Sequence, residues 1–342
     1  MKARHFSGIV VALAAIALCA FAAGHSDVTV SFAGDILLDR GVADAIRAHS
    51  ADYLFDGVGD IFSASDIAFA NLEGPLSAGG SGVLKDEWLL FRADPSCAQA
   101  MKSAGLTILN LANNHSMDYG HTGLENTMEA LRANGILPLG AGMDKESAHE
   151  PAFLRKMGAK IGFLGFSDFP PEGYFYNAQK ADIAYADRNT LADAVKDAKE
   201  NCDILIVSFH WGAEFTHNAG QSQQDLAHLA IESGADAVVG HHPHVLQGIE
   251  IYRGKPVFYS LGNFVFDQQV QHGTDETIIV SISVKDKRIE TIKLIPVQII
   301  DCQPVRADAS KANQILDELE QYSGGLHIYR EDSGTGYLNL NN

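Results

Sequence analysis

Short apolar runs alternate with amphipathic stretches along most of the chain. The runs are four to six residues long and rich in Val, Ile, Leu, Phe and Ala, a pattern typical of buried strands. Strands are predicted at residues 28–33, 67–70, 106–111, 161–166, 204–209, 237–240 and 256–260. Helices are predicted at residues 39–49, 95–104, 124–134, 191–201 and 221–233. Alternation of this kind indicates an α/β fold.

The pattern changes after residue 274. Two strand-like runs, 277–284 and 289–296, flank a polar turn and predict a hairpin. A last amphipathic stretch, 310–322, predicts a terminal helix. We expect one large domain over residues 27–300, followed by a C-terminal helix and tail over residues 301–342.

The first 24 residues have the pattern of an export signal. Two basic residues precede a nearly uninterrupted apolar run from 8 to 23, and Ala20 and Ala22 offer a cleavage point. The residue before Cys19 is unfavourable for lipoprotein processing, so cleavage is preferred to lipidation. An uncleaved anchor is the alternative, because the run lies at the lower limit for spanning a bilayer. We expect an exported protein that is periplasmic, secreted or held at the cell surface.

The net charge of the chain disfavours one class of binding partner. The chain has 342 residues, a formal net charge of -18 and 46% hydrophobic residues, which is typical of a globular protein. Such acidity disfavours nucleic acid as a partner, because binding to phosphates relies on clustered Lys and Arg. The four cysteines are widely spaced and one lies in the leader, which indicates buried thiols rather than a disulfide framework.

Polar residues gather immediately after five of the predicted strands. The segments are Gly34-Asp35, Asn71-Leu72-Glu73, Asn113-Asn114-His115, His210-Trp211-Gly212 and Gly240-His241-His242-Pro243-His244. Ligands bind at the carboxyl ends of strands in open α/β sheets. We therefore expect the five segments to meet in one crevice.

The residue types in these segments suit divalent metal ions. Carboxylates, an amide oxygen and imidazoles are ligands for Mn²⁺, Fe or Zn²⁺. A pair of ions would bind a phosphoryl-like group, lower the pKa of a bridging water and stabilise developing charge. His242 and His244 flank Pro243, which restricts the turn and lets the two rings point to neighbouring ions. One or two ions are expected as cofactors.

Taken singly, each residue has a structural alternative. Asp35 could cap the helix that is predicted from residue 39. His210 beside Trp211 could be an ordinary packed histidine, and Asn113-Asn114 could form a turn. Only the joint pattern, with every segment at one edge, favours a site.

The motifs together resemble a known family. They are Gly34-Asp35, Asn71-Leu72-Glu73, Ala112-Asn113-Asn114-His115 followed by Asp118-Tyr119-Gly120, His210-Trp211-Gly212, Gly240-His241-His242-Pro243-His244 and Ser260-Leu261-Gly262-Asn263-Phe264. In this order and spacing, over residues 28–267, the chain resembles the CapA family associated with poly-γ-glutamate capsule synthesis. That family is similar to calcineurin-like metallophosphoesterases, which implies a four-layer αββα sandwich and a two-metal site.

The resemblance also implies residue roles. The implied metal ligands are Asp35, Glu73, Asn114, His210, His242 and His244. His115 matches the imidazole that protonates the leaving group in phosphoesterases. Leu37 stands where those enzymes have a ligating histidine, and Glu73 replaces their bridging aspartate. Both departures leave room for a single metal or an altered metal preference.

Three further residues are candidates for binding substrate. Asn263 could donate hydrogen bonds, and Arg92 could bind a carboxylate or phosphate. Arg40 is a third candidate, or a group that pairs with Asp35 or Glu73.

Two classes of function are open at this stage. The first is a metal-dependent hydrolase or transferase of the cell envelope, acting on a phosphoester or an anionic polymer such as poly-γ-glutamate. The second is a non-catalytic metal-containing component that binds the polymer and helps to export or anchor it, together with membrane proteins of capsule synthesis. The first is preferred, because an imidazole beside a metal ligand serves catalysis better than binding.

Overall fold

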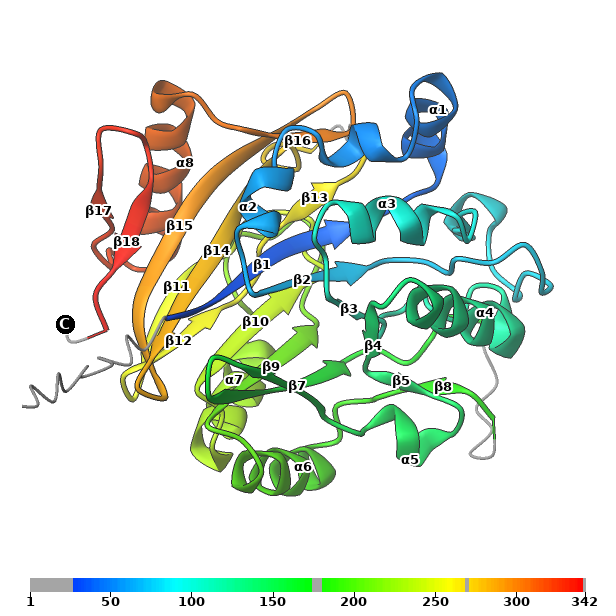
Figure 1. Cartoon of the computed structure of the whole chain (residues 1–342), viewed down its shortest axis with the longest axis horizontal. Coiled ribbons are helices and arrows are strands. Elements are labelled where there is room, and N and C mark those ends of the chain that lie inside the picture. The colour runs from blue at the N-terminus through cyan, green and yellow to red at the C-terminus, as the bar shows by residue number, and fades with distance from the viewer. Residues whose placement is uncertain (1–26, 174–179, 268–270, 341–342) are drawn as a thin grey trace, which may run out of the picture.

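Two mixed sheets form the body of the protein (Figure 1). The computed structural model describes residues 27–173, 180–267 and 271–340, so the predicted leader lies outside the described residues. The first sheet has the strand order β17-β18-β15-β14-β1-β2-β3-β4, with β13 beside β1 and β16 beside β15. The second sheet has the order β11-β12-β10-β9-β7-β6, and β5 and β8 form a separate pair.

The first sheet consists of β1 (Val28–Ile36), β2 (Ile67–Leu72), β3 (Ile108–Asn110), β4 (Leu137–Leu139), β13 (Asn263–Val265), β14 (Glu276–Lys285), β15 (Arg288–Ile300), β16 (Gln303–Arg306), β17 (Tyr329–Arg330) and β18 (Gly336–Leu338). The second sheet consists of β6 (Ala152–Lys156), β7 (Ala159–Ser167), β9 (Ile204–His210), β10 (Ala237–His241), β11 (Ile249–Tyr252) and β12 (Lys255–Phe258). The small pair is β5 (Ala141–Gly142) and β8 (Asp182–Ile183). The helices are α1 (Arg40–Ala48), α2 (Gly59–Ser63), α3 (Cys97–Ser103), α4 (Gly120–Ala133), α5 (Lys145–Ala148), α6 (Arg188–Glu200), α7 (Gln221–Ser233) and α8 (Ala309–Tyr322), with short 3-10 turns at Asp52–Phe55 and Glu87–Leu89.

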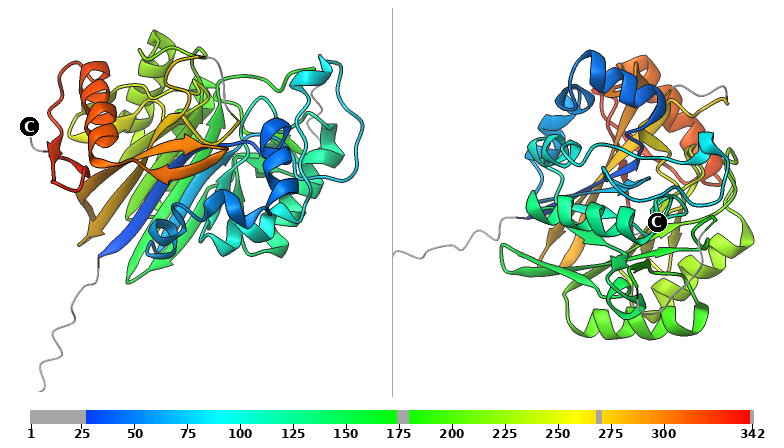
Figure 2. Two further views of the ribbon diagram at one scale, coloured as in Figure 1. Left: turned by 90° about the horizontal axis from the view of Figure 1, so that it is seen from above. Right: turned by 90° about the vertical axis from the view of Figure 1, so that its right-hand side faces the viewer.

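Three apolar clusters separate four layers. Successive residues of a strand point to opposite faces, and in β1 Phe32 joins the core between the sheets while Ala33 joins the core under α1 to α4. The inter-sheet core includes the stacked rings of Phe69 and Phe163, whose centroids are 6.1 Å apart. A third cluster packs α6 and α7 against the outer face of the second sheet. Helices α1 to α4 thus lie on one outer face and α6 and α7 on the other (Figure 2), while α8 packs against the core between the sheets. This arrangement confirms the predicted α/β fold and αββα layering.

The predicted elements are present with modest changes in their ends. Each of the seven predicted strands is found, and β1 continues to Ile36, beyond the predicted end at residue 33. The predicted hairpin is β14 and β15, which pair antiparallel. The terminal helix is α8, and two strands of residues 301–342, β16 and β18, pair with β15.

The expectation of buried free thiols is confirmed in part, because Cys97, Cys202 and Cys302 are all free but only Cys97 is buried. Within residues 27–173, 180–267 and 271–340, none of the helices combines the length and apolar character needed to cross a membrane.

The extension of β1 places Asp35 inside the sheet. Asp35 lies opposite Asn263 of β13 and Asn71 of β2. The helix that follows is capped by Asp39, whose side chain accepts a hydrogen bond from Arg40 N. The alternative that Asp35 is a helix cap is therefore wrong.

Close backbone packing beside Asp35 requires glycine at position 34. The Asp35 N–H donates to Gly262 O over 3.0 Å, and a Cβ on Gly34 would lie 2.0 Å from that oxygen. We predict that Gly34→Ala lowers the free energy of unfolding by about 1–3 kcal/mol or more, because backbone must move to relieve the clash. Gly59→Ala is the control, since a Cβ there meets nothing within 4 Å. Equal denaturation midpoints for the two variants would contradict this account.

Candidate metal centre

The predicted metal ligands converge at the carboxyl ends of strands from both sheets. Asp35 lies near the end of β1, and His210 is the last residue of β9. The others follow β2, β3 and β10 as Glu73, Asn114, His242 and His244. All six side chains are buried. The five segments therefore meet, although they do so between two sheets rather than along one.

Two groups of side chains have the spacing of metal ligands. Asp35, Glu73 and His244 each offer one ligand atom, and these atoms lie within 4.8 Å of one another. Glu214, His242 and His244 form a second group within the same limit. His244 belongs to both groups, as a residue between two neighbouring ions would. Glu214 is exposed and was missed by the sequence prediction.

His210 and Asn114 adjoin these groups. His210 Nε2 lies 2.9 Å from Asn114 Oδ1 and 3.1 Å from His242 Nδ1. Which of these ring nitrogens carries a proton depends on the tautomers of His210 and His242. An amide oxygen and an imidazole nitrogen thus lie around His210 Nε2, and atoms of these types form a donor set that a divalent cation prefers.

The backbone of the His242–His244 turn is strained in a way that aims both rings. His242 has a φ of 98° and His244 a φ of 59°. Non-glycine residues rarely occupy this region, at a cost of about 1–3 kcal/mol each. The rings stand 5.8 Å apart between centroids. Strain of this kind persists only where surrounding contacts hold it, and it is common at functional sites.

Burial keeps the imidazoles in the form that binds metal. Desolvation, followed by the charges of neighbouring histidines, lowers the pKa of His210 well below its usual value and that of His242 to about 3. Both rings are neutral at pH 7, and only a neutral ring has a lone pair to offer.

The carboxylates respond differently to burial. Desolvation, then the negative charges of Asp35 and Glu214, raise the pKa of Glu73 well above its usual value. Burial also opposes ionisation of Asp35, but His241, His244 and the His242 N–H outweigh it and lower the pKa of Asp35. A cation beside Glu73 would stabilise the ionised form of this carboxyl and so lower its pKa again.

Several buried polar atoms have no partner among the described residues. They include Glu73 Oε2 and both ring nitrogens of His241. Leaving such atoms unpaired costs about 1–3 kcal/mol each. Glu73 Oε2 sits in the ligand group itself, and a bound cation would satisfy it. The donor set therefore fits one or two divalent ions.

Asparagine side chains position the ligands through hydrogen bonds. Asn71 Nδ2 donates to Asp35 Oδ1 over 2.8 Å, and Asn110 Nδ2 donates to Asn71 Oδ1 over 2.9 Å. Asn263 was expected to contact substrate. Instead it is fully buried, with its Oδ1 2.9 Å from His244 Nδ1 and its Nδ2 donating to Thr274 O. Its contacts orient the His244 ring.

His115 stands beside the ligand groups with its two nitrogens facing different ways. Nδ1 lies 3.0 Å from Asp118 Oδ2, and Nε2 lies 3.7 Å from Glu73 Oε1. The ring stacks on Phe91 at 4.2 Å between centroids. Burial lowers the pKa of His115, and the Asp118 carboxylate opposes this shift. Asp118 thus fixes a proton on Nδ1 and leaves Nε2 directed at the centre.

A buried lysine completes this arrangement. Lys85 Nζ lies 2.7 Å from Asp118 Oδ1, 3.2 Å from Glu172 Oε2 and 3.2 Å from His115 Nδ1. Its side chain is only 7% exposed. Lys85 therefore neutralises Asp118 in a place where an unpaired carboxylate would be costly. The sequence prediction missed both Lys85 and the part that Asp118 plays.

Neither of the two predicted arginines forms an ion pair with a predicted ligand, although the Arg40 charge opposes the rise in the pKa of Glu73. Arg40 pairs with Asp267 over 2.5 Å and lies over the rings of Phe91 and Phe266. The expectation that Arg40 pairs with Asp35 or Glu73 is therefore wrong. Arg92 is exposed, with its guanidinium 4.3 Å from the centre of the Tyr119 ring.

Leu37 offers no ligand to the centre, because its side chain is apolar. The side chain is fully buried in a small apolar cluster with Phe91 and Phe266. The position where the resemblance places a histidine is therefore part of the packing below the site.

Comparison with known proteins identifies a family and relatives of this chain. The family model described as "Bacterial capsule synthesis protein PGA_cap" matches residues 29–268. The PGA biosynthesis protein CapA of Bacillus subtilis (strain 168) is 33% identical over 298 residues, 86% of this chain and 78% of that protein. The capsule biosynthesis protein CapA of Bacillus anthracis is 31% identical over 292 residues, 82% of this chain and 69% of that protein.

A solved structure shares the fold alone. A hypothetical protein from Thermus thermophilus superposes with a TM-score of 0.50 at 15% identity, covering 79% of this chain and 99% of that one.

The two histidines of the strained turn provide a direct test of the centre. We predict that His242→Ala or His244→Ala weakens the affinity for Mn²⁺ or Zn²⁺ by about 100-fold or more, because each change deletes a ligand and releases its neighbours. Elemental analysis after desalting measures the bound metal. His228→Ala and His272→Ala are the controls, since His228 pairs with Glu250 and His272 is exposed. Wild-type metal content in both turn variants would refute the assignment.

Proposed function

Because the chain belongs to the family of bacterial capsule synthesis proteins, PGA_cap, we propose that it is a metal-dependent hydrolase or transferase acting in the synthesis or processing of poly-γ-glutamate. The proposed substrate is the anionic polymer itself or a phosphoester. The link to poly-γ-glutamate comes from the family, and the hydrolase or transferase reaction is proposed from the residues of the site.

The observation that carries the proposal is the orientation of His115. Its Nε2 faces Glu73 in the ligand group, while its Nδ1 is held by Asp118. A protein that only holds a polyanion has no use for an oriented imidazole at this place, since Lys or Arg would bind better. The arrangement therefore favours the catalytic class over the non-catalytic one.

The residues around the centre have separate proposed roles. Asp35, Glu73, Asn114, His210, His242 and His244 would hold the ions, with Glu214 as an additional carboxylate. Bound divalent ions supply Lewis acidity and a water of lowered pKa. Asn71 and Asn263 orient Asp35 and His244 through hydrogen bonds.

The proton needed by a leaving oxygen comes from His115 in this proposal. The acid is the His115 imidazolium: Asp118 holds its Nδ1 proton, and the proton on Nε2, on the side of the centre, passes to the leaving oxygen and leaves a neutral ring. Burial lowers the pKa of His115, which makes the imidazolium a stronger acid. Lys85 balances the charge of Asp118 and keeps that carboxylate from taking the proton itself. Phe91 covers one face of the ring and excludes water from it.

We further propose that the protein acts in the cell envelope, with membrane proteins of capsule synthesis as partners. The basic and apolar leader pattern of residues 1–24 motivates this proposal. Amino-terminal sequencing of exported protein should find the chain starting after about residue 22. An intact Met1 in the membrane fraction would indicate an anchor instead.

His115→Gln separates the two function classes. We predict that the variant keeps its fold and metal but loses turnover by about 10²- to 10⁴-fold, the usual contribution of a general acid. The loss should be largest for substrates with poor leaving groups, which depend most on protonation. Assays would compare phosphoesters and γ-glutamyl polymers with the metal-loaded protein.

The matched control for this variant is His272→Gln, at an exposed position outside the site. Unchanged turnover in His115→Gln would remove the acid role. Binding of polymer without any turnover in the metal-loaded wild type would favour the non-catalytic class.

A further inference from the structure

A second cavity lies at the opposite ends of the strands that carry the metal centre. It has a volume of about 740 Å³, and its walls include Ile204 at the start of β9 and Lys255 at the start of β12. His210, in the metal centre, is the last residue of β9. At a rise of about 3.3 Å per residue, the cavity and the centre are roughly 20 Å apart. The two sites are therefore distinct.

The charges around this cavity leave a positive surplus. The buried Asp236 carboxylate is shared by Lys199 Nζ at 2.5 Å and Lys255 Nζ at 2.6 Å, so this triad keeps one positive charge. The Arg288 guanidinium forms no ion pair or hydrogen bond with another described side chain, which adds a second. A local surplus is notable in a chain with a net charge of -18.

The remaining charges near the cavity are balanced. Lys287 pairs with Asp203 over 2.9 Å, and Lys285 approaches Glu290 to 3.7 Å. Arg288 is consequently the lining side chain with the greatest capacity to bind a carboxylate, which its planar fork can hold through two parallel hydrogen bonds.

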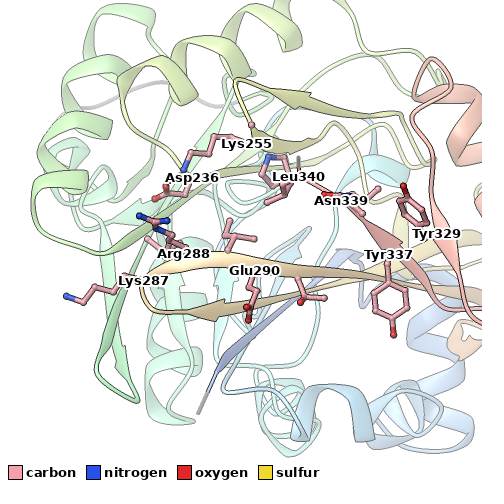
Figure 3. A pocket seen from close by; sticks show the side chains of 15 residues that line it. Asp236, Lys255, Lys287, Arg288, Glu290, Tyr329, Tyr337, Asn339 and Leu340 are labelled. Atoms are coloured by element: carbon pink, nitrogen blue, oxygen red, sulfur yellow. Dashed lines mark hydrogen bonds and ion pairs between the residues drawn. The ribbon is translucent and has the colours of Figure 1, made fainter. Parts of the chain in front are cut away.

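The rest of the wall combines apolar, aromatic and uncharged polar side chains with the balanced carboxylate of Glu290. Figure 3 shows Lys255, Asp236 and Arg288 toward one end of the cavity and Tyr329 and Tyr337 toward the other, with Leu340 and Asn339 between them. Ile289 and Thr291 also line the cavity. A ligand that suits this wall has carboxylates spaced along an uncharged chain of methylene and amide groups.

We propose that this cavity binds a segment of a polycarboxylate chain, such as a γ-glutamyl polymer, with Arg288 as its principal anchor. The choice of a γ-glutamyl polymer rests on the proposed function. The preference for a chain of carboxylates rests only on the charge and shape of the cavity. Bound here, a long chain would be held about 20 Å from the metal centre, which raises the local concentration of its remaining length there.

An anionic membrane surface is the competing occupant. Val28, where the described sheet begins, lines a smaller neighbouring cavity together with Lys285 and Lys287, so a leader that stayed attached would emerge on this edge. A bilayer offers a continuous plane of phosphates, whereas the positive surplus here is confined to Lys255 and Arg288 on the wall of a cavity. Single carboxylates of a flexible chain can reach these two side chains separately.

The test uses metal-loaded full-length mature protein and a γ-glutamyl decamer, with binding followed by calorimetry at low and physiological salt. Arg288→Glu should weaken binding by about tenfold or more, because it replaces a charge-assisted contact with repulsion. Arg288→Gln should lie in between. Arg47→Glu is the matched control, since Arg47 is an exposed residue of α1 and its replacement makes the same change in net charge. Metal content should be unchanged in all three variants.

The outcomes separate this proposal from the proposed function. Arg288-dependent binding of the decamer supports the cavity even if no turnover is found for the wild type. Equal affinity of wild type and Arg288→Glu overturns it. Arg288-dependent binding to phosphatidylglycerol vesicles, with no binding of the decamer, would also overturn it and assign the edge to the membrane.

Discussion

The buried carboxylate of Asp35 is the interaction on which the centre depends. Asn71 donates to its Oδ1 from the first sheet, and the backbone N–H of His242 donates to its Oδ2 from the end of the second. A buried carboxylate is tolerated only when it is hydrogen-bonded or paired. This requirement ties the two sheets together at one edge and holds the strained His242–His244 turn in place. The same requirement explains why a compensating cation fits there.

Much of the site followed from sequence because its members come directly after regular strands. Apolar runs predicted the strands, and the carboxyl-edge rule then predicted that Asp35, Glu73 and His210 would meet. What sequence could not supply was side-chain direction. Asn263 and Arg40 were expected at the substrate, but Asn263 turns back to support His244, and Arg40 is drawn to Asp267. Such choices depend on partners far along the chain.

Two of the residues missed by sequence reasoning, Lys85 and Glu214, come from loops. Lys85 reaches Asp118 from an irregular segment, and Glu214 lies just past the motif that contains His210. No periodicity marks such positions. His241 ends the strand β10, and the family resemblance gave a role to His242 and His244 but none to His241. In the structure its Nδ1 lies 3.5 Å from Asp35 Oδ1, and neither ring nitrogen makes a hydrogen bond with a described residue.

The central claim is that this edge binds one or two divalent ions between the sheets. Anomalous X-ray diffraction from crystals grown with Mn²⁺, recorded at the manganese absorption edge, tests it most directly. The account predicts a peak within bonding distance of Asp35, Glu73 and His244, and, if a second ion binds, another contacted by His242 and Glu214. A fully occupied Mn²⁺ peak elsewhere on the protein, with none at this edge, would contradict it.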